Sequence, residues 1–297
     1  MRFAMWYDVM KQLAYKDALY IDLPKGKVHY TDAGQGPVIL HSHGSPSGAD
    51  VGPIFLKHLV NKGYRVLTPS RPGFLGTDLS MGPSIEDQAD FFKDFLDGMG
   101  IEKAFIHAWS AGGPPAIAFA HKYPERCQGL ILYCAVSHTW VHKITRFEKM
   151  IMSDKGIWCL YSLGSIFKES MRKKSAQELG CDYDYIKRDP EAIALLDKFL
   201  TMTAPPALRN PGSFNDIDNY SKMGDLPLEE IRVPTLVVFS PSDNQLPVTN
   251  GDLPAEKIPG ADYLRFTHGG HMPMIDKEAG LVEATVLDFL EKHHGSN

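Results

Sequence analysis

The 297-residue chain lacks several features that would place it in a specialised class of protein. Its four cysteines include no Cys-x-x-Cys pair, and Cys127 and Cys134 fall in or beside an apolar, strand-like run where buried thiols are expected. No stretch approaches the ~18 uninterrupted apolar residues that a membrane crossing needs. The longest Lys/Arg run is Lys173-Lys174 and the formal net charge is -5, which argues against a nucleic-acid-binding protein.

Cofactor and targeting signals are missing as well. The chain has no phosphate-binding loop and no Gly-x-Gly-x-x-Gly motif, so no cofactor is expected. Asp8 and Lys11 interrupt the first apolar stretch, which makes that stretch a poor signal peptide. We therefore expect a cytoplasmic monomer or homodimer that acts on a small molecule and has neither a nucleic acid nor a membrane as a partner.

What the chain does have is an alternation of short apolar runs with longer amphipathic ones. Residues 38–42 and 103–110 are typical of buried strands. Residues 84–100 have the pattern of a capped helix, because Ser84 precedes Asp87 by three positions and apolar residues follow at helical spacing. Strands that alternate with helices predict an α/β fold, in which helices cover both faces of a mostly parallel central sheet.

This alternation stops after residue 137. Residues 138–232 contain helix-like segments and no clear strand, and the strand pattern returns with VPTLVVF at residues 233–239. We interpret residues 138–232 as a helical cap, or lid, inserted after the sixth strand, and residues 1–137 and 233–297 as the core domain. Most apolar side chains between Phe147 and Phe167 are expected to pack inside the cap or against the sheet, and a minority to line a pocket.

Ser110 lies in the segment HAWSAGGPP (107–115), between a strand-like run and a helix-like run. A serine on a sharp strand-to-helix turn presents its hydroxyl at the edge of the sheet, and small neighbours let the helix and the strand approach each other closely. Because a serine hydroxyl is a weak nucleophile at neutral pH, it needs a base and a group that orients the base. The alternative is a structural serine in a glycine-rich connection.

A second turn, HGSP at residues 43–46, follows the strand at 38–42. Its Ser45 N–H is expected to point at a developing oxyanion, with the N–H of Ala111 as its partner. The alternatives are a plain turn and a metal site built on His41 and His43. A zinc site needs at least a third ligand at suitable spacing, and none is found nearby, so no metal is expected.

Asp243 and His271 supply the remaining parts of a catalytic triad. Asp243 comes just after the buried strand in VVFSPSD, and His271 lies in THGGHMP after the last strand. The chain order of Ser110, acid and base is one of three unrelated orders that build this triad. Asp252 and His268 are the alternatives, but Asp252 is more remote from its strand end and His268 lies nearer to the strand itself.

With these motifs the chain resembles the α/β-hydrolase fold superfamily. It is most similar to bacterial hydrolases with an HGxPG oxyanion turn, a DRPGYGxSD stretch and a Ser-Gly-Gly-Gly-Pro elbow, which read HGSPSG, SRPGFLGTD and SAGGPP here. Ser47 replaces the family glycine, Ser70 replaces the family aspartate, and Leu75 is an additional residue. The resemblance covers residues 28–290 apart from the cap and implies a serine hydrolase.

The expected activity is that of a carboxylesterase-like enzyme. It would cleave an ester bond of a small, uncharged, modestly hydrophobic substrate through an acyl-enzyme on Ser110, with Trp109 and His43 as candidate substrate-binding residues. The same triad on the same fold also cleaves C–C bonds, lactones and thioesters, and some α/β-hydrolases serve as small-molecule receptors. These alternatives differ in the pocket, which the sequence does not reveal.

Overall fold

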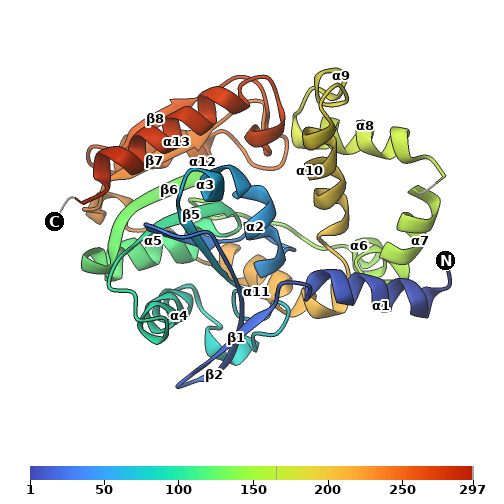
Figure 1. The fold of residues 1–297 in the computed structure, drawn as a ribbon, viewed down its shortest axis with the longest axis horizontal. Coiled ribbons are helices and arrows are strands. Elements are labelled where there is room, and N and C mark those ends of the chain that lie inside the picture. The colour runs from blue at the N-terminus through green and yellow to red at the C-terminus, as the bar shows by residue number, and fades with distance from the viewer. Residues whose placement is uncertain (165, 296–297) are drawn as a thin grey trace.

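The centre of the computed structural model, which describes residues 1–164 and 166–295, is a single sheet (Figure 1). Within the described residues the sheet has eight strands in the order β1-β2-β4-β3-β5-β6-β7-β8. The β1–β2 and β2–β4 pairs are antiparallel, and the other neighbours are parallel. The strands are β1 (Leu19–Leu23), β2 (Gly26–Ala33), β3 (Val38–Ser42), β4 (Arg65–Pro69), β5 (Ala104–Ser110), β6 (Cys127–Ala135), β7 (Thr235–Phe239) and β8 (Asp262–Arg265).

Helices cover both faces of this sheet. The helices of the core are α2 (Gly52–Phe55), α3 (Lys57–Asn61), α4 (Ile85–Gly98), α5 (Gly113–Lys122), α12 (Thr249–Lys257) and α13 (Ala279–His293). Side chains of α2, α3 and α13 belong to one apolar cluster, and those of α5 and of α4 after its first residue to another. Along β5, Phe105 points into the first cluster and Ile106 into the second, as the period of two in a strand requires. The predicted α/β fold is therefore confirmed.

The sequence pattern predicts some helices and strands better than others. The helix expected after Ser84 is α4, and its capping box joins Ser84 to Asp87 in both directions. The segment IFLKHLVNKGY (54–64) has the apolar spacing of a single helix, but it is broken between α2 and α3 because the backbone leaves the helical region at Leu56. Strand β1 was not predicted, because it is an edge strand with mostly exposed side chains and carries no clean apolar alternation.

The chain between β6 and β7, residues 136–234, carries helices and no strand among its described residues, and we call it the insertion. Its helices within the described residues are α6 (Arg146–Ile151), α7 (Asp154–Gly164), α8 (Lys168–Leu179), α9 (Tyr183–Ile186), α10 (Pro190–Thr201) and α11 (Asn210–Tyr220). The N-terminal helix α1 (Phe3–Ala14) packs against α7 at the right of Figure 1. There Trp6 is fully buried in a small cluster with Met10 and Ala204. The first residues of the chain therefore pack on the insertion.

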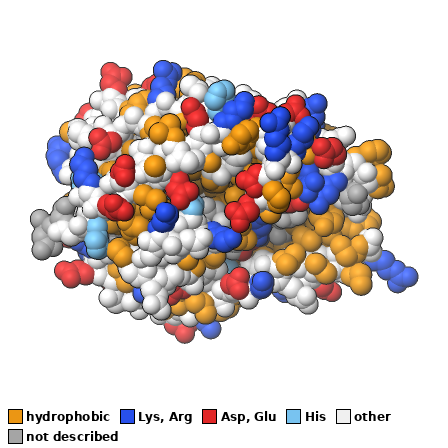
Figure 2. All heavy atoms as spheres, turned by 45° about the horizontal axis from the view of Figure 1, so that its top comes forward, with side chains coloured by type: hydrophobic (Ala, Val, Ile, Leu, Met, Phe, Trp, Pro, Cys, Tyr) orange, Lys and Arg blue, Asp and Glu red, His pale blue; other side chains and the backbone are white. Residues whose placement is uncertain are grey.

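The surface at this end of the molecule is rich in apolar side chains. Figure 2 shows hydrophobic side chains gathered at the right. The exposed apolar residues of α1 and of residues 147–167 include Met5, Phe147, Leu163, Ile166 and Phe167. The expectation that most apolar residues of 147–167 pack inside the insertion is therefore wrong for several of them. None of the helices in the described part of the chain has both the length and the hydropathy to cross a membrane.

Candidate active site

Ser110 ends strand β5 in a strained conformation. Its backbone φ is +54°, in the left-handed region that residues other than glycine rarely adopt. The elbow also brings backbones close together, since a Cβ on Gly112 would lie 2.0 Å from the Ser42 carbonyl oxygen and one on Gly113 would lie 2.0 Å from that of Val136. Sharp turn and small neighbours are the geometry that a nucleophile elbow requires.

His271 and Asp243 form a buried pair beside this elbow. His271 Nδ1 lies 2.7 Å from Asp243 Oδ2, and each side chain is at most 4% exposed. The other carboxylate oxygen of Asp243 accepts hydrogen bonds from the backbone N–H groups of Gln245 at 2.7 Å and Leu246 at 3.0 Å. These amides fix the carboxylate, so that it can hold the imidazole in one orientation and leave Nε2 available.

Ser110 and His271 line the same cavity, which has a volume of about 350 Å³. Ser45, Ala111 and Trp109 line it as well. Besides Ser110, four residues that the sequence predicts for the site thus line this cavity from the core: His271, Ser45, Ala111 and Trp109. The insertion closes the cavity with residues from the segments around α6, α10 and α11, namely Trp140, His142, Met152, Phe199, Met202, Ser213, Asp216, Ile217 and Tyr220.

The turn that carries Ser45 packs directly on the nucleophile. A Cβ built on Gly44 would lie 3.0 Å from the Cβ of Ser110 and 3.2 Å from the Trp109 ring. Ser45 Oγ donates a hydrogen bond to Ser213 Oγ of the insertion at 3.0 Å. Ser45 and Ala111, whose N–H groups are the two predicted oxyanion donors, therefore both lie beside Ser110 and line its cavity.

The alternative acid and base lie elsewhere. Asp252 accepts a hydrogen bond from the Tyr263 hydroxyl at 2.8 Å, outside the cavity. His268 is exposed, and its backbone N–H donates to the Glu278 carboxylate at 2.7 Å. Of the candidates weighed from the sequence, Asp243 and His271 are thus the pair that the fold brings together next to Ser110.

Trp109 and His43 have different surroundings. Trp109 Nε1 donates to the His271 carbonyl at 3.2 Å, and the Trp109 ring lines the cavity. His43 does not reach the cavity: it is fully buried, its Nε2 accepts the Arg71 N–H at 2.9 Å, and its Nδ1 lies 2.7 Å from the Gly44 carbonyl. The prediction that His43 binds substrate is therefore wrong, because both of its ring nitrogens have partners inside the fold.

A buried ionic network that sequence reasoning missed lies behind the oxyanion turn. Arg71 Nε donates to the His43 carbonyl at 2.9 Å, and its two terminal nitrogens donate to Asp216 at 2.8 and 2.6 Å. Burial disfavours the charge of Arg71, but its interactions with Asp216 and Tyr220 together outweigh burial and raise the pKa of Arg71. Tyr220, one turn further along α11, donates its hydroxyl hydrogen to the Ala111 carbonyl. Asp216 and Tyr220 have no sequence signal, since they lie in a segment without a recognised motif.

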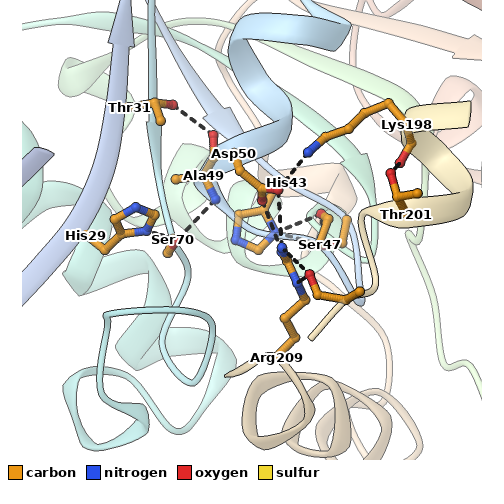
Figure 3. Close-up of polar contacts among 12 residues, drawn as sticks. His29, Thr31, His43, Ser47, Ala49, Asp50, Ser70, Lys198, Thr201 and Arg209 are labelled. Carbon is orange, nitrogen blue, oxygen red and sulfur yellow. Dashed lines mark hydrogen bonds and ion pairs between the residues drawn. The ribbon is translucent and has the colours of Figure 1, made fainter. Parts of the chain in front are cut away.

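A second ionic cluster ties the insertion to the segment after the turn (Figure 3). Asp50 is 6% exposed and accepts hydrogen bonds from Arg209 at 3.0 and 3.2 Å and from Lys198 at 2.9 Å. Figure 3 shows both cations reaching Asp50 from the insertion. Burial alone would raise the pKa of Asp50, but the charges of Arg209 and Lys198 outweigh it and lower the pKa to about 2.

Ser70, which stands where the similar hydrolases have an aspartate, anchors the same segment from the other side (Figure 3). Its Oγ accepts the Ala49 N–H at 3.0 Å and lies 2.8 Å from His29 Nδ1. Thr31 donates to the Ala49 carbonyl at 2.8 Å. The substitution therefore keeps a hydrogen-bonding group that fixes the backbone next to Asp50.

The apolar residues of α7 lie away from Ser110. Ile157, Leu160 and Tyr161 line a separate cavity of about 520 Å³ between α7, α8 and α10, which contains none of the triad candidates. Of the apolar residues between Phe147 and Phe167, Met152 lines the cavity of Ser110, and most of the insertion's other apolar lining residues come from Trp140 and from the segments around α10 and α11. The sequence did not distinguish these helices, because all of them carry apolar side chains.

Known proteins share this architecture. The sequence profile of the alpha/beta hydrolase fold matches residues 37–156. The chain is 30% identical to the uncharacterized hydrolase YcgS of Bacillus subtilis (strain 168), over 90% of this chain and 95% of that protein. This chain belongs to the α/β-hydrolase fold family.

Two further proteins are similar to this chain. The 2-hydroxy-6-oxo-6-phenylhexa-2,4-dienoate hydrolase of Comamonas testosteroni is 27% identical over 91% of this chain and 93% of its own length. The solved structure of an alpha/beta hydrolase fold protein from Nakamurella multipartita superposes with a TM-score of 0.83, with 26% identity, 94% of this chain and 100% of that chain covered. The protein is accordingly a hydrolase of the α/β fold.

Proposed function

We propose that the protein is a serine hydrolase that cleaves esters of small, uncharged, modestly hydrophobic substrates. The observation that carries this proposal is the combination of Ser110 at φ +54° with the His271–Asp243 pair, since Ser110 and His271 line one cavity. A structural serine has no need of a strained elbow beside a buried imidazole–carboxylate pair.

In this proposal Ser110 Oγ attacks the ester carbonyl carbon while His271 Nε2 accepts the hydroxyl proton. Asp243 stabilises the resulting imidazolium and keeps the ring in place. The Ser45 and Ala111 N–H groups hydrogen-bond to the tetrahedral oxyanion. The C–O bond to the alcohol then breaks, and His271 gives its proton to the departing alkoxide. Water repeats the sequence on the acyl-enzyme, which releases the acid and restores Ser110.

The cavity supports an uncharged substrate. Its walls include the apolar side chains of Trp109, Phe199, Met202 and Leu246, and none of its described lining residues is Lys or Arg. The carboxylate of Asp216 is already paired with Arg71. A charged substrate would lose its hydration here without gaining a counterion. The insertion, which supplies much of this lining, would act as the cap over the substrate.

A second candidate is the hydrolysis of a C–C bond. The curated relative from Comamonas testosteroni is named as a 2-hydroxy-6-oxo-6-phenylhexa-2,4-dienoate hydrolase, and the two proteins align over most of their lengths. The name denotes a carboxylate substrate, for which the cavity described above has no Lys or Arg partner. We therefore rank this activity second.

Steady-state kinetics distinguish ester hydrolysis from hydrolysis of a C–C bond. The enzyme is expected to hydrolyse 4-nitrophenyl acetate and phenyl acetate with kcat/KM at least about tenfold above that for a succinate monoester, because an unpaired buried charge is costly. Ser110→Ala should lower kcat by about 10³-fold or more and leave the circular dichroism spectrum unchanged. Turnover of the dienoate that exceeds turnover of the esters would favour the second candidate, and wild-type turnover by Ser110→Ala would refute both.

A further inference from the structure

The C-terminal end of helix α8 touches both loops that carry the acid and the base. We call this end, residues 176–181, the α8 terminus. Three of its backbone carbonyls accept hydrogen bonds from those loops, each at 2.8 Å: Gln177 from Asn244 Nδ2, Glu178 from Gln245 Nε2 and Leu179 from the His271 N–H. One donor is thus the backbone of the base itself, and the other two follow the acid directly in the chain.

These contacts satisfy carbonyl groups that every helix leaves without a partner at its C-terminal end. The last four carbonyls of an α-helix have no partner inside the helix. In α8 the Ala176 carbonyl is satisfied locally by the Cys181 N–H at 2.8 Å, and Gln177 also accepts the Gly180 N–H at 3.0 Å. For Glu178 and Leu179 the structure records partners from the acid and base loops. The acid and base loops therefore supply hydrogen-bond donors to the end of α8, and the end of α8 supplies acceptors that hold the two loops.

Glycines allow this close approach. Gly180 and Gly270 have φ values of +78° and +49°. A Cβ on Gly180 would lie 1.7 Å from the Ser242 carbonyl oxygen, next to the acid, and one on Gly270 would lie 1.9 Å from the Leu179 carbonyl oxygen. Backbone packs on backbone at both points, so that a single added methyl group must push the α8 terminus away from the acid loop or the base loop.

Cys181 adds a side-chain contact to the base loop. Its Sγ donates to the Gly269 carbonyl at 3.0 Å, two residues before His271. Burial raises the pKa of Cys181 to about 12, so the thiol keeps its proton and remains a donor. From the opposite side, Cys134 at the end of β6 donates to the Gly270 carbonyl at 3.4 Å. The peptide groups that precede the base are thus held from the insertion and from the sheet.

We propose that the α8 terminus is a positioning element for His271 and Asp243, so that the insertion is part of the catalytic machinery and not only a cover over the substrate. This inference rests on the proposed serine hydrolase function. Gly180 and Cys181 are its positioning residues. The polarity of the helix agrees with the role, because the partial negative charge of a helix C-terminus favours a nearby cation, and His271 becomes an imidazolium during each acyl transfer.

The test is the Gly180→Ala variant, with Gly224→Ala as its matched control. Gly224 also has a positive φ, +65°, and lies in the insertion, but a Cβ there would meet nothing within 4 Å. Both variants carry the strain of a left-handed alanine, and only Gly180→Ala displaces the triad loops. We expect Gly180→Ala to lower kcat for 4-nitrophenyl acetate about 10²-fold with KM within about twofold, since a misplacement of about 1 Å costs this much. Gly224→Ala should keep wild-type kcat.

A second pair of variants covers the case in which Gly180→Ala does not fold. Cys181→Ala removes the donor to Gly269, whereas Cys181→Ser keeps one. We expect kcat to fall about threefold to fivefold in Cys181→Ala, the effect of one neutral hydrogen bond, and to recover in Cys181→Ser. A purely structural role would lower the thermal midpoint without this split between kcat and KM.

The outcomes separate the inference from the proposed function. If the wild-type protein neither turns over the ester nor reacts with a fluorophosphonate, the proposed function fails, and the inference fails with it. If the wild type reacts and a folded Gly180→Ala has the same kcat and labelling rate, the function stands and the inference is overturned. If Gly180→Ala does not fold, a wild-type kcat in Cys181→Ala overturns it.

Discussion

At the scale of single residues, Asp243 is assigned as the acid of the site because each of its two carboxylate oxygens has a distinct set of contacts. Asp243 Oδ1 accepts two backbone N–H groups and Oδ2 lies 2.7 Å from His271. Asp243→Asn keeps the size but places an amide where one carboxylate oxygen was. We expect kcat to fall by about 10⁴-fold, because the imidazole is then held in the wrong tautomer. Ester hydrolysis measures it, and a loss below tenfold would contradict the assignment of Asp243 as the acid.

Gly44 is the residue at which the oxyanion turn meets the nucleophile. A methyl group there would lie 3.0 Å from the Cβ of Ser110, so Gly44→Ala should push the Ser45 N–H out of position. We expect a loss of roughly 10²- to 10³-fold in kcat, the cost of one oxyanion donor. Gly280→Ala, where a Cβ meets nothing within 4 Å, is the control and should keep wild-type kcat. Equal rates in the two variants would show that the turn does not serve the oxyanion.

The sequence could point to Ser110, Asp243 and His271 because each lies at a strand end, where the order of elements fixes the position. It failed for His43, whose side chain turns into the fold and bonds to Arg71. It could not find Tyr220, because a contact between α11 and the elbow depends on how the insertion packs. Motifs next to strands are thus predictable, and contacts across the insertion are not.

At the scale of elements, the ion pairs that join the insertion to Asp50, in the segment after the oxyanion turn, depend on pH. Asp50 has an ordinary pKa of 3.8, and Arg209 and Lys198 lower it to about 2 in the folded protein. A lowered carboxyl pKa stabilises the fold at pH values above 3.8, and this contribution is lost as the pH falls through 2. The difference corresponds to roughly 2 kcal/mol.

Asp50→Asn is expected to lower the free energy of unfolding at pH 7 by about 3 to 5 kcal/mol, because Arg209, 1% exposed, loses its counterion. The decline in stability between pH 4 and pH 2 should become shallower than in the wild type. Urea unfolding across this range measures both effects. Asp22→Asn is the control, since Asp22 is 83% exposed and 3.9 Å from Lys27. If Asp50→Asn behaves like Asp22→Asn, the cluster does not hold the insertion.

Helix α1 is the other element that stabilises the insertion. Trp6 is fully buried, and its ring lies 6.2 Å from that of Tyr161 on α7. Trp6→Ala should destabilise the protein by about 3 to 5 kcal/mol, the usual cost of removing a buried aromatic side chain. Thermal unfolding measures it, with Met5→Ala as the control because Met5 is 63% exposed. Equal midpoints for the two variants would mean that α1 does not stabilise the fold.

At the scale of the whole molecule, the alternation of strands and helices was sufficient to predict an α/β fold, because a parallel sheet needs a crossover helix between successive strands. The shape of the cavity was not predictable. It arises where α10 and α11 meet the ends of β5 and β6, and apolar residues on α6 and α7 look the same in sequence as those on α10. The residues that would select the substrate therefore become visible only in three dimensions.

The most direct test of the proposed function is reaction of the purified protein with a fluorophosphonate, followed by peptide mapping. Such a probe modifies a serine only when an adjacent base activates it. We predict stoichiometric modification of Ser110 in the wild type and none in His271→Ala. A folded wild-type protein that remains unmodified at Ser110, or is modified equally in His271→Ala, would contradict the account.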